Sequence, residues 1–204
     1  MSRKDYYEKD TDEIYEQPYE RTAGWVPSKD TINAIQGRDD IDSLQEAKVV
    51  EELRMVEGIN PVDWKDMSEY ERLEILQDVE ERVARVQGRP PAHVATYAAT
   101  PGEFGYYNPD TNEINISSNS LKNDDVKEVV DTLIHEGRHA YQHYAVEHPD
   151  IHSDRQEVAA WAINLQKDHY LSADRYGQEL YQTQPVEKDA WRYAQTIINE
   201  IYGD

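Results

Sequence analysis

Residues 135–139, with the sequence His-Glu-Gly-Arg-His, combine side chains that could bind a metal ion and use it for chemistry. On a helix, His135 and His139 lie one turn apart on the same face, where two imidazoles can bind one zinc ion. A carboxylate between them, here Glu136, can take a proton from a water molecule held by that ion. The spacing therefore predicts a zinc site with a general base, although so short a pattern also arises by chance.

The residues around this motif are typical of an amphipathic helix. Apolar side chains recur at helical spacing at Val126, Val129, Val130, Leu133, Ala140 and Tyr144. We expect the helix to run from about residue 124 to about residue 146, with Asn123 as its N-cap. A surface helix with two solvated histidines is the simpler alternative. Gly137 argues against it, because glycine inside a helix costs about 1 kcal/mol relative to alanine, and a close approach by another backbone would explain it.

A catalytic zinc site requires a third protein ligand, and the sequence offers several candidates. Gln142 and Ala145 stand where the metzincin pattern requires a glycine and a third histidine, which excludes that class. His143 lies one turn further along the helix, and three ligands spread over these two turns would span about 12 Å, too far to share one ion. With no cysteine in the chain, carboxylates on later helices remain, and generic spacing slightly favours Glu157 over Glu187.

The composition limits the partners and the compartment. The chain has 204 residues, enough for one domain with a core, and contains 21 Lys and Arg residues against 42 Asp and Glu residues. The net charge of -21 repels phosphate backbones and anionic membranes, so we expect no nucleic acid and no membrane as a partner. The N-terminus lacks the apolar segment of a signal peptide. We expect a soluble protein that is cytoplasmic or is exported without a cleavable signal peptide.

Helices should precede the motif. Residues 1–30 are polar and lack apolar periodicity, which predicts a flexible leader. Residues 31–88 should form a helical extension or scaffold. Within it we expect one helix over residues 40–57 and another from Ser68, which begins a capping box, to Gly88. Both helices most simply supply core and support.

A small sheet and two more helices complete the predicted fold, which is α+β and mainly helical. The sheet should be an antiparallel meander directly before the motif helix, with strands at residues 93–97, 104–107 and 113–117. An exposed edge of this sheet could bind an extended peptide as an added strand. The later helices should cover residues 153–169, from a capping box at Ser153, and the residues from Pro185 to the C-terminus.

Three segments resemble minimal zinc metallopeptidase domains of the gluzincin type, which occur in bacterial polymorphic toxins, effectors and phage-related proteins. They are HEGRHAYQ, the preceding YYNPDTNEINIS and the later YQTQPVEKDAWRYA, and the likeness covers roughly residues 93 to 200. The resemblance implies a zincin-like metallopeptidase core over residues 89–204. It further implies the site residues, which are the zinc ligands His135, His139 and Glu187 and the general base Glu136. It thus favours Glu187 over Glu157 as the third ligand.

The predicted function is that of a zinc metallopeptidase that hydrolyses a peptide bond in a specific protein substrate. The resemblance also implies a role as a toxin or effector. Glu136 would pass its proton to the leaving amine, and Tyr181 or Tyr193 could stabilise the oxyanion. Residues 1–88 could then target or inhibit an enzyme that cuts one repressor or host protein. The alternative function is a non-catalytic module with a zincin fold that binds a partner protein through its strand edge.

Overall fold

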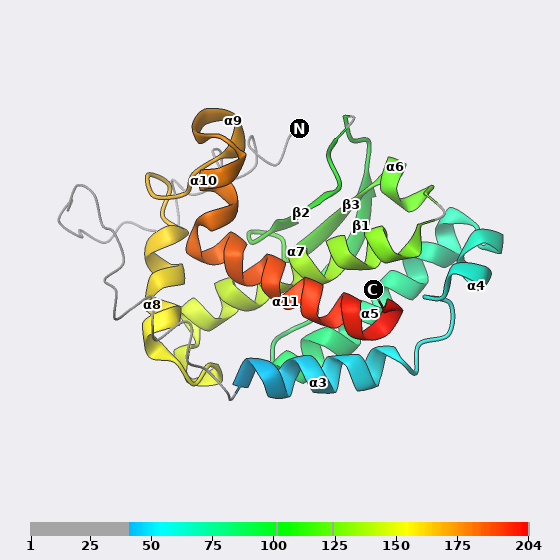
Figure 1. The fold of residues 1–204 in the computed structure, drawn as a ribbon, viewed down its shortest axis with the longest axis horizontal. Coiled ribbons are helices and arrows are strands. Elements are labelled where there is room, and N and C mark those ends of the chain that lie inside the picture. Colours follow the sequence, from blue (N-terminus) through cyan, green and yellow to red (C-terminus); the bar gives the residue numbers. More distant parts are fainter. Residues whose placement is uncertain (1–40, 101, 124, 204) are drawn as a thin grey trace.

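The described part of the chain is mainly helical and carries one small sheet (Figure 1). This computed structural model describes residues 41–100, 102–123 and 125–203. The α+β class predicted from the sequence is confirmed at this level. The leader predicted for residues 1–30 lies outside the described residues. No helix among the described ones combines the length and the apolar character needed to cross a lipid bilayer.

The helices described before the sheet are α3 (Ile41–Leu53), α4 (Pro61–Asp66) and α5 (Glu69–Gln87). The strands are β1 (His93–Tyr97), β2 (Gly105–Asn108) and β3 (Glu113–Ser117), followed by the short α6 (Ser118–Leu121) and the motif helix α7 (Val126–Glu147). The chain continues through a 3-10 turn, η1 (Pro149–Ile151), and then through α8 (Arg155–Asn164), α9 (Ala173–Tyr176), α10 (Gln178–Thr183) and α11 (Pro185–Tyr202).

Two of the predicted helix starts are confirmed. The Ser68 hydroxyl accepts a hydrogen bond from the Glu71 N–H, and the Glu71 carboxylate accepts one from the Ser68 N–H, which closes the capping box of α5. Gly88 ends this helix in a left-handed conformation with a φ of 72°. Pro185 is the first residue of α11, a position where an N–H would have no partner within the helix.

Two other helix starts are displaced from the predicted residue to an aspartate. Asp125, rather than Asn123, caps α7 by accepting hydrogen bonds from two N–H groups of the first turn. Asp154, rather than Ser153, caps α8 in the same way. A carboxylate at a helix N-terminus also interacts favourably with the helix dipole, which explains the preference. α8 ends earlier than predicted, at Asn164.

The sheet is mixed, with the strand order β1-β3-β2. β2 and β3 form the predicted antiparallel pair, joined by a turn in which the Asn108 side chain accepts from the N–H groups of Asp110 and Thr111. β1 pairs with β3 in parallel, so the predicted antiparallel meander is wrong for this strand. The connection from Tyr97 to Gly105 is longer than a tight hairpin turn, which lets β1 and β2 lie on opposite sides of β3.

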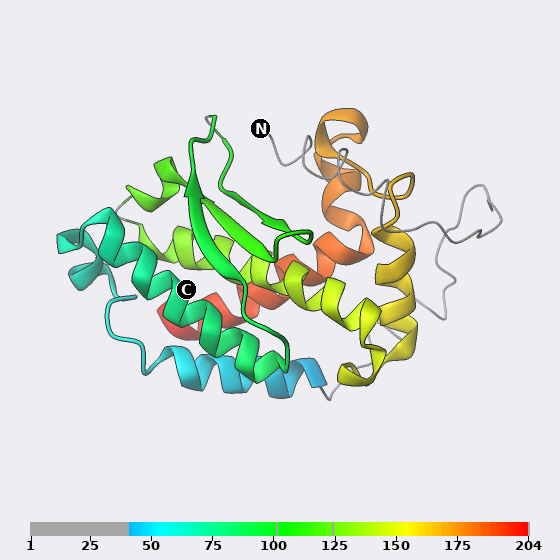
Figure 2. The same ribbon diagram turned by 180° about the vertical axis from the view of Figure 1, so that it is seen from behind.

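One hydrophobic core joins the sheet to α3, α5, α7 and α11. It contains Val130 and Leu133 from the predicted apolar stripe of α7, together with Leu53 of α3 and Leu76 of α5. Each such buried side chain stabilises the fold by about 1.5–3 kcal/mol. The helices between residue 41 and Gln87 therefore supply part of the hydrophobic core against which the motif helix packs. The sheet and the α9–α10 segment lie on one side of α7 and α11, and α3 lies on the other (Figure 1 and Figure 2).

Gly137 makes room for a buried ion pair beside the motif helix. A Cβ atom at this position would lie 3.2 Å from both Arg89 Nη2 and Glu80 Oε2, and 4.0 Å from Ile114 Cδ1. Arg89 Nη1 lies 2.6 Å from Glu80 Oε1, and both side chains are 1% exposed. The expectation that another backbone approaches Gly137 is thus wrong, because side chains of other elements fill this space.

Replacing Glu80 by alanine should lower the free energy of unfolding by about 3–5 kcal/mol, because Glu80→Ala leaves the Arg89 guanidinium buried without its carboxylate. Glu81→Ala, on the exposed face of the same helix, should change that free energy by less than about 0.5 kcal/mol. Chemical denaturation of the two variants measures both values. Equal stability of the two variants would contradict a supporting role for the ion pair.

Candidate metal centre

Three side chains from two helices meet in the protein interior. His135 and His139 project from one face of α7, and Glu187 lies in the first turn of α11, which packs on α7. The two histidine Nε2 atoms are 3.1 Å apart, and each lies 3.4 Å from an oxygen of the Glu187 carboxylate. All three side chains are at most 3% exposed, so the interpretation as a surface helix with solvated histidines is wrong. His143 is not part of this group, as expected.

The triangle of donor atoms has the size of a zinc site. At zinc distances of about 2.1 Å, tetrahedral ligand atoms lie about 3.4 Å from one another. Glu187 Oε2 is buried and makes no hydrogen bond within the described part of the chain, as expected for an atom that faces an ion. Two imidazoles and a carboxylate are also a known donor set for catalytic zinc. The three residues could thus hold one metal ion.

The charges within this cluster favour a bound cation. Burial raises the pKa of the Glu187 carboxyl, but the nearby His139 and His135 hold it well below its usual range. Burial lowers the pKa of the His139 imidazole, but the Glu187 carboxylate raises it to about 9. Glu187 is therefore ionised in the interior and requires a positive partner. A metal ion and an imidazolium proton are alternative ways to supply that charge.

Glu136 lies in the same helical turn and is tied to the sheet. The residue is 1% exposed, and its Oε2 accepts a hydrogen bond of 3.0 Å from the N–H of Tyr107. Tyr107 belongs to β2, an edge strand, so this N–H is used outside the sheet. The hydrogen bond holds the Glu136 carboxylate between α7 and the edge of the sheet.

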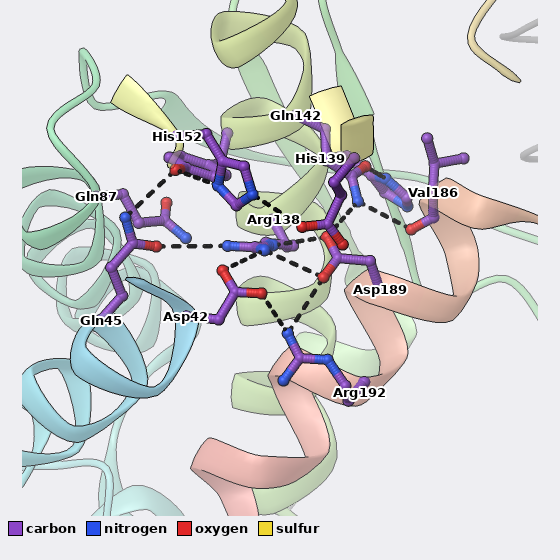
Figure 3. Close-up of polar contacts among 12 residues, drawn as sticks. Asp42, Gln45, Gln87, Arg138, His139, Gln142, His152, Val186, Asp189 and Arg192 are labelled. Atoms are coloured by element: carbon purple, nitrogen blue, oxygen red, sulfur yellow. Dashed lines mark hydrogen bonds and ion pairs between the residues drawn. The ribbon is translucent and has the colours of Figure 1, made fainter. Parts of the chain in front are cut away.

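Gln142 fixes the orientation of His139 (Figure 3). Its Nε2 donates to the Val186 carbonyl at 2.9 Å and to Asp189 Oδ2 at 2.8 Å. Its Oε1 therefore accepts the proton of His139 Nδ1, across 2.9 Å. In the neutral ring this leaves Nε2 of His139 without a proton. The amide thus selects the tautomer that can bind a metal through Nε2.

Arg138 connects this amide to helix α3 (Figure 3). Its guanidinium is fully buried and bonds Asp189 at 2.8 and 3.0 Å and Asp42 at 2.9 Å. Arg192 bonds the same Asp42 carboxylate at 2.7 Å. Because Asp189 also accepts from Gln142, a continuous chain of contacts runs from α3 to the metal centre.

Glu157, the other candidate for the third ligand, lies in a different cluster. Its Oε2 pairs with His152 Nε2 at 2.8 Å. Its carboxylate lies within 4.8 Å of those of Asp42 and Asp189, a group that could hold a cation of its own. The Arg138 guanidinium already binds two of these carboxylates and supplies that positive charge. The generic spacing that favoured Glu157 thus pointed to a residue away from the histidine pair.

A cavity of about 430 Å³ opens beside His135. It is bounded by α7, by the loop before β2, by the segment from Tyr170 to the end of α10, and by Trp191 of α11. Tyr181 lines this cavity, as expected for a donor to an oxyanion. Tyr193 does not line it, and its ring instead packs against the Arg138 guanidinium at 4.4 Å. The expectation that Tyr193 could stabilise an oxyanion is therefore wrong.

Tyr170 is a contact of the metal centre that the sequence reasoning missed. Its hydroxyl donates to Glu187 Oε1 at 2.8 Å, and the residue also lines the cavity. The segment between α8 and α11 is made of short helices and loops, without an apolar period that would signal which side chains turn inward. Only the folded chain brings this tyrosine to Glu187.

The cluster predicts about one bound zinc ion per chain. Glu187→Gln should weaken zinc binding at least about 100-fold, because it removes the charged ligand of a buried site. Glu157→Gln, a buried carboxylate on a neighbouring helix, should leave the affinity within about threefold of the original. Competition with a chromophoric chelator measures both affinities. A larger loss in Glu157→Gln than in Glu187→Gln would move the third ligand to Glu157.

A second experiment tests whether the hydrogen bond from His139 to Gln142 is needed for zinc binding. Gln142→Leu should reduce zinc affinity by about 10–100-fold, because His139 loses the acceptor that fixes its ring and its tautomer. Gln195→Leu, an exposed glutamine on α11, is the control and should bind zinc as the original chain does. If Gln142→Leu folds normally by circular dichroism and keeps its full zinc affinity, His139 does not depend on this amide.

Comparison of the chain with protein-family models, with curated proteins and with solved structures gave no match. The likeness to gluzincin-type metallopeptidases therefore rests on the three sequence segments that carry it. The geometry of the metal centre does not depend on that likeness, since the donor atoms, their distances and their burial follow from the fold itself.

Proposed function

We propose that the chain is a zinc metallopeptidase that hydrolyses a peptide bond in a protein substrate. The observation that carries this proposal is the meeting of two histidines of α7 and Glu187 at one buried point, with Glu136 in the same helical turn. A structural zinc site has no need of a further carboxylate between its histidines. Three protein ligands also leave a coordination position open for a reactant. The likeness to gluzincin-type domains, with its zincin-like core, supports the same assignment.

The chemistry divides between the metal and the chain. Zinc, when bound, polarises the scissile carbonyl and lowers the pKa of water to about 7. Glu136 would take a proton from the attacking water and later pass it to the leaving amine. The N–H of Tyr107 holds the Glu136 carboxylate in one orientation for this transfer. Tyr181, which lines the cavity, is the remaining candidate to donate a hydrogen bond to the developing oxyanion.

The surroundings of the site suit a polypeptide substrate. β2 is an edge strand beside α7, and an extended peptide could add to this edge as a further strand if it takes over the Tyr107 N–H that now donates to Glu136. Large apolar side chains are exposed near the cavity. Phe104, in its wall, is 42% exposed, and Leu180 of α10 is 50% exposed. Exposed apolar groups of this kind favour contact with another chain.

Glu136→Gln should keep the zinc ion but lower the rate of peptide hydrolysis by about 10²–10⁴-fold, because an amide cannot accept the proton. Glu147→Gln, exposed at the end of the same helix, should keep full activity. Mass spectrometry of a proteome-derived peptide library, incubated with each zinc-loaded variant, measures the rates and identifies the cleaved bonds.

Two results of this experiment would count against the proposal. Hydrolysis by Glu136→Gln at the original rate would remove Glu136 from the mechanism. Zinc binding without hydrolysis by the original chain would favour the non-catalytic module that binds a partner protein through its strand edge.

A further inference from the structure

We propose that the cavity beside the metal centre binds a basic side chain, of arginine or lysine, next to the scissile bond of the substrate. His135 lines the cavity, so a side chain bound there belongs to a residue close to the cleaved bond. This choice of substrate class rests on the proposed peptidase function. Recognition of the cation can nevertheless be tested without hydrolysis.

Carboxylates line the cavity from several elements. Glu128 and Asp131 come from α7, Glu103 from the loop before β2, and Asp174 from α9. Among the described residues that line this cavity there is no lysine and no arginine. The carboxylates attract a cationic side chain and repel an acidic one. The wall thus selects for positive charge.

The carboxylates of α7 lie at increasing distance from the metal centre. Glu128, Asp131 and His135 follow one another at helical spacing and form a row along one face of the helix. Asp131 lies about 6 Å and Glu128 about 10 Å from His135 along the helix axis. A side chain that starts at the scissile bond must be long to meet these groups. Arginine and lysine combine that length with the required charge.

Aromatic rings form much of the remaining wall, at Phe104, Tyr170, Tyr181 and Trp191. The rings of Tyr170 and Tyr181 meet edge to face, with centroids 6.3 Å apart. Aromatic faces attract cations and also pack against the methylene stem of arginine or lysine. A purely apolar side chain would contact the rings but would displace water from the carboxylates without replacing the hydrogen bonds of that water. A long basic side chain satisfies both parts of the wall.

The indole of Trp191 is the part of this wall that lies against His135. Trp191 Nε1 is buried and makes no hydrogen bond to any described residue, although a buried indole N–H usually has an acceptor. The Trp191 ring packs on His135, with centroids 4.7 Å apart, so this donor lies beside the metal centre. In a chain of net charge -21, acidic residues alone would mean little, and the cavity and its aromatic rings distinguish the site.

The test uses two blocked pentapeptides of alanine with a central arginine or a central citrulline, which has a similar shape but no charge. Each peptide is titrated into the full, zinc-loaded chain carrying Glu136→Gln, which suppresses hydrolysis. Binding is followed at the indole N–H resonance of Trp191, assigned with Trp191→Phe. We expect the arginine peptide to bind at least about tenfold more tightly than the citrulline peptide.

Two double variants in the same Glu136→Gln chain locate the source of this preference. Glu128→Gln with Asp131→Asn should abolish it, whereas Glu51→Gln with Glu147→Gln, which removes two exposed charges elsewhere, should keep it. Equal binding of the two peptides, or a preference that survives the loss of the cavity carboxylates, would overturn the proposal even if the chain hydrolyses peptides. Preferred binding of the arginine peptide with no hydrolysis by the original chain would support the cation site while the peptidase function failed.

Discussion

A guanidinium buried between helices sets a constraint that the rest of the structure has to meet. Arg138 is 0% exposed, and a buried charge without partners is strongly destabilising. Burial alone would lower the pKa of this guanidinium, but Asp189 and Asp42 raise it well above its usual value, so the charge is permanent. The two carboxylates come from α11 and α3, at opposite ends of the described chain. The motif helix can bury Arg138 only if both of these helices dock on it.

The same contact restricts the geometry of the candidate metal centre. Asp189 and Glu187 both lie near the start of α11, so docking of Asp189 on α7 restricts how this helix can rotate and where Glu187 points. Asp189 also accepts from Gln142, whose other end holds His139. One carboxylate therefore serves both the buried cation and the orientation of a candidate metal ligand. The helix turn that neutralises Arg138 through Asp189 thus also carries Glu187 against the histidine pair.

Local signals in the sequence suffice for those parts of the fold that depend on neighbours in the chain. The capping box at Ser68, the start of α11 and the turn between β2 and β3 are all confirmed. The parallel pairing of β1 and the contact of Asp42 with Arg138 join distant segments, which local composition cannot signal. The histidine pair likewise follows from spacing alone. Glu157 and Glu187 are both early-helix glutamates, so only the resemblance, and then the fold, separates them.

The five residues of the His-Glu-Gly-Arg-His segment point to all sides of α7, and all five are buried. His135 and His139 face α11, Glu136 faces β2, Gly137 faces the ion pair at the end of α5, and Arg138 faces α3 and α11. Burial on every side requires that other elements surround the helix and exclude solvent. In such surroundings a carboxylate attracts a cation far more strongly than it does in water. The buried cluster that could hold a metal ion is therefore a product of the fold around α7, which the same five residues on an exposed helix would lack.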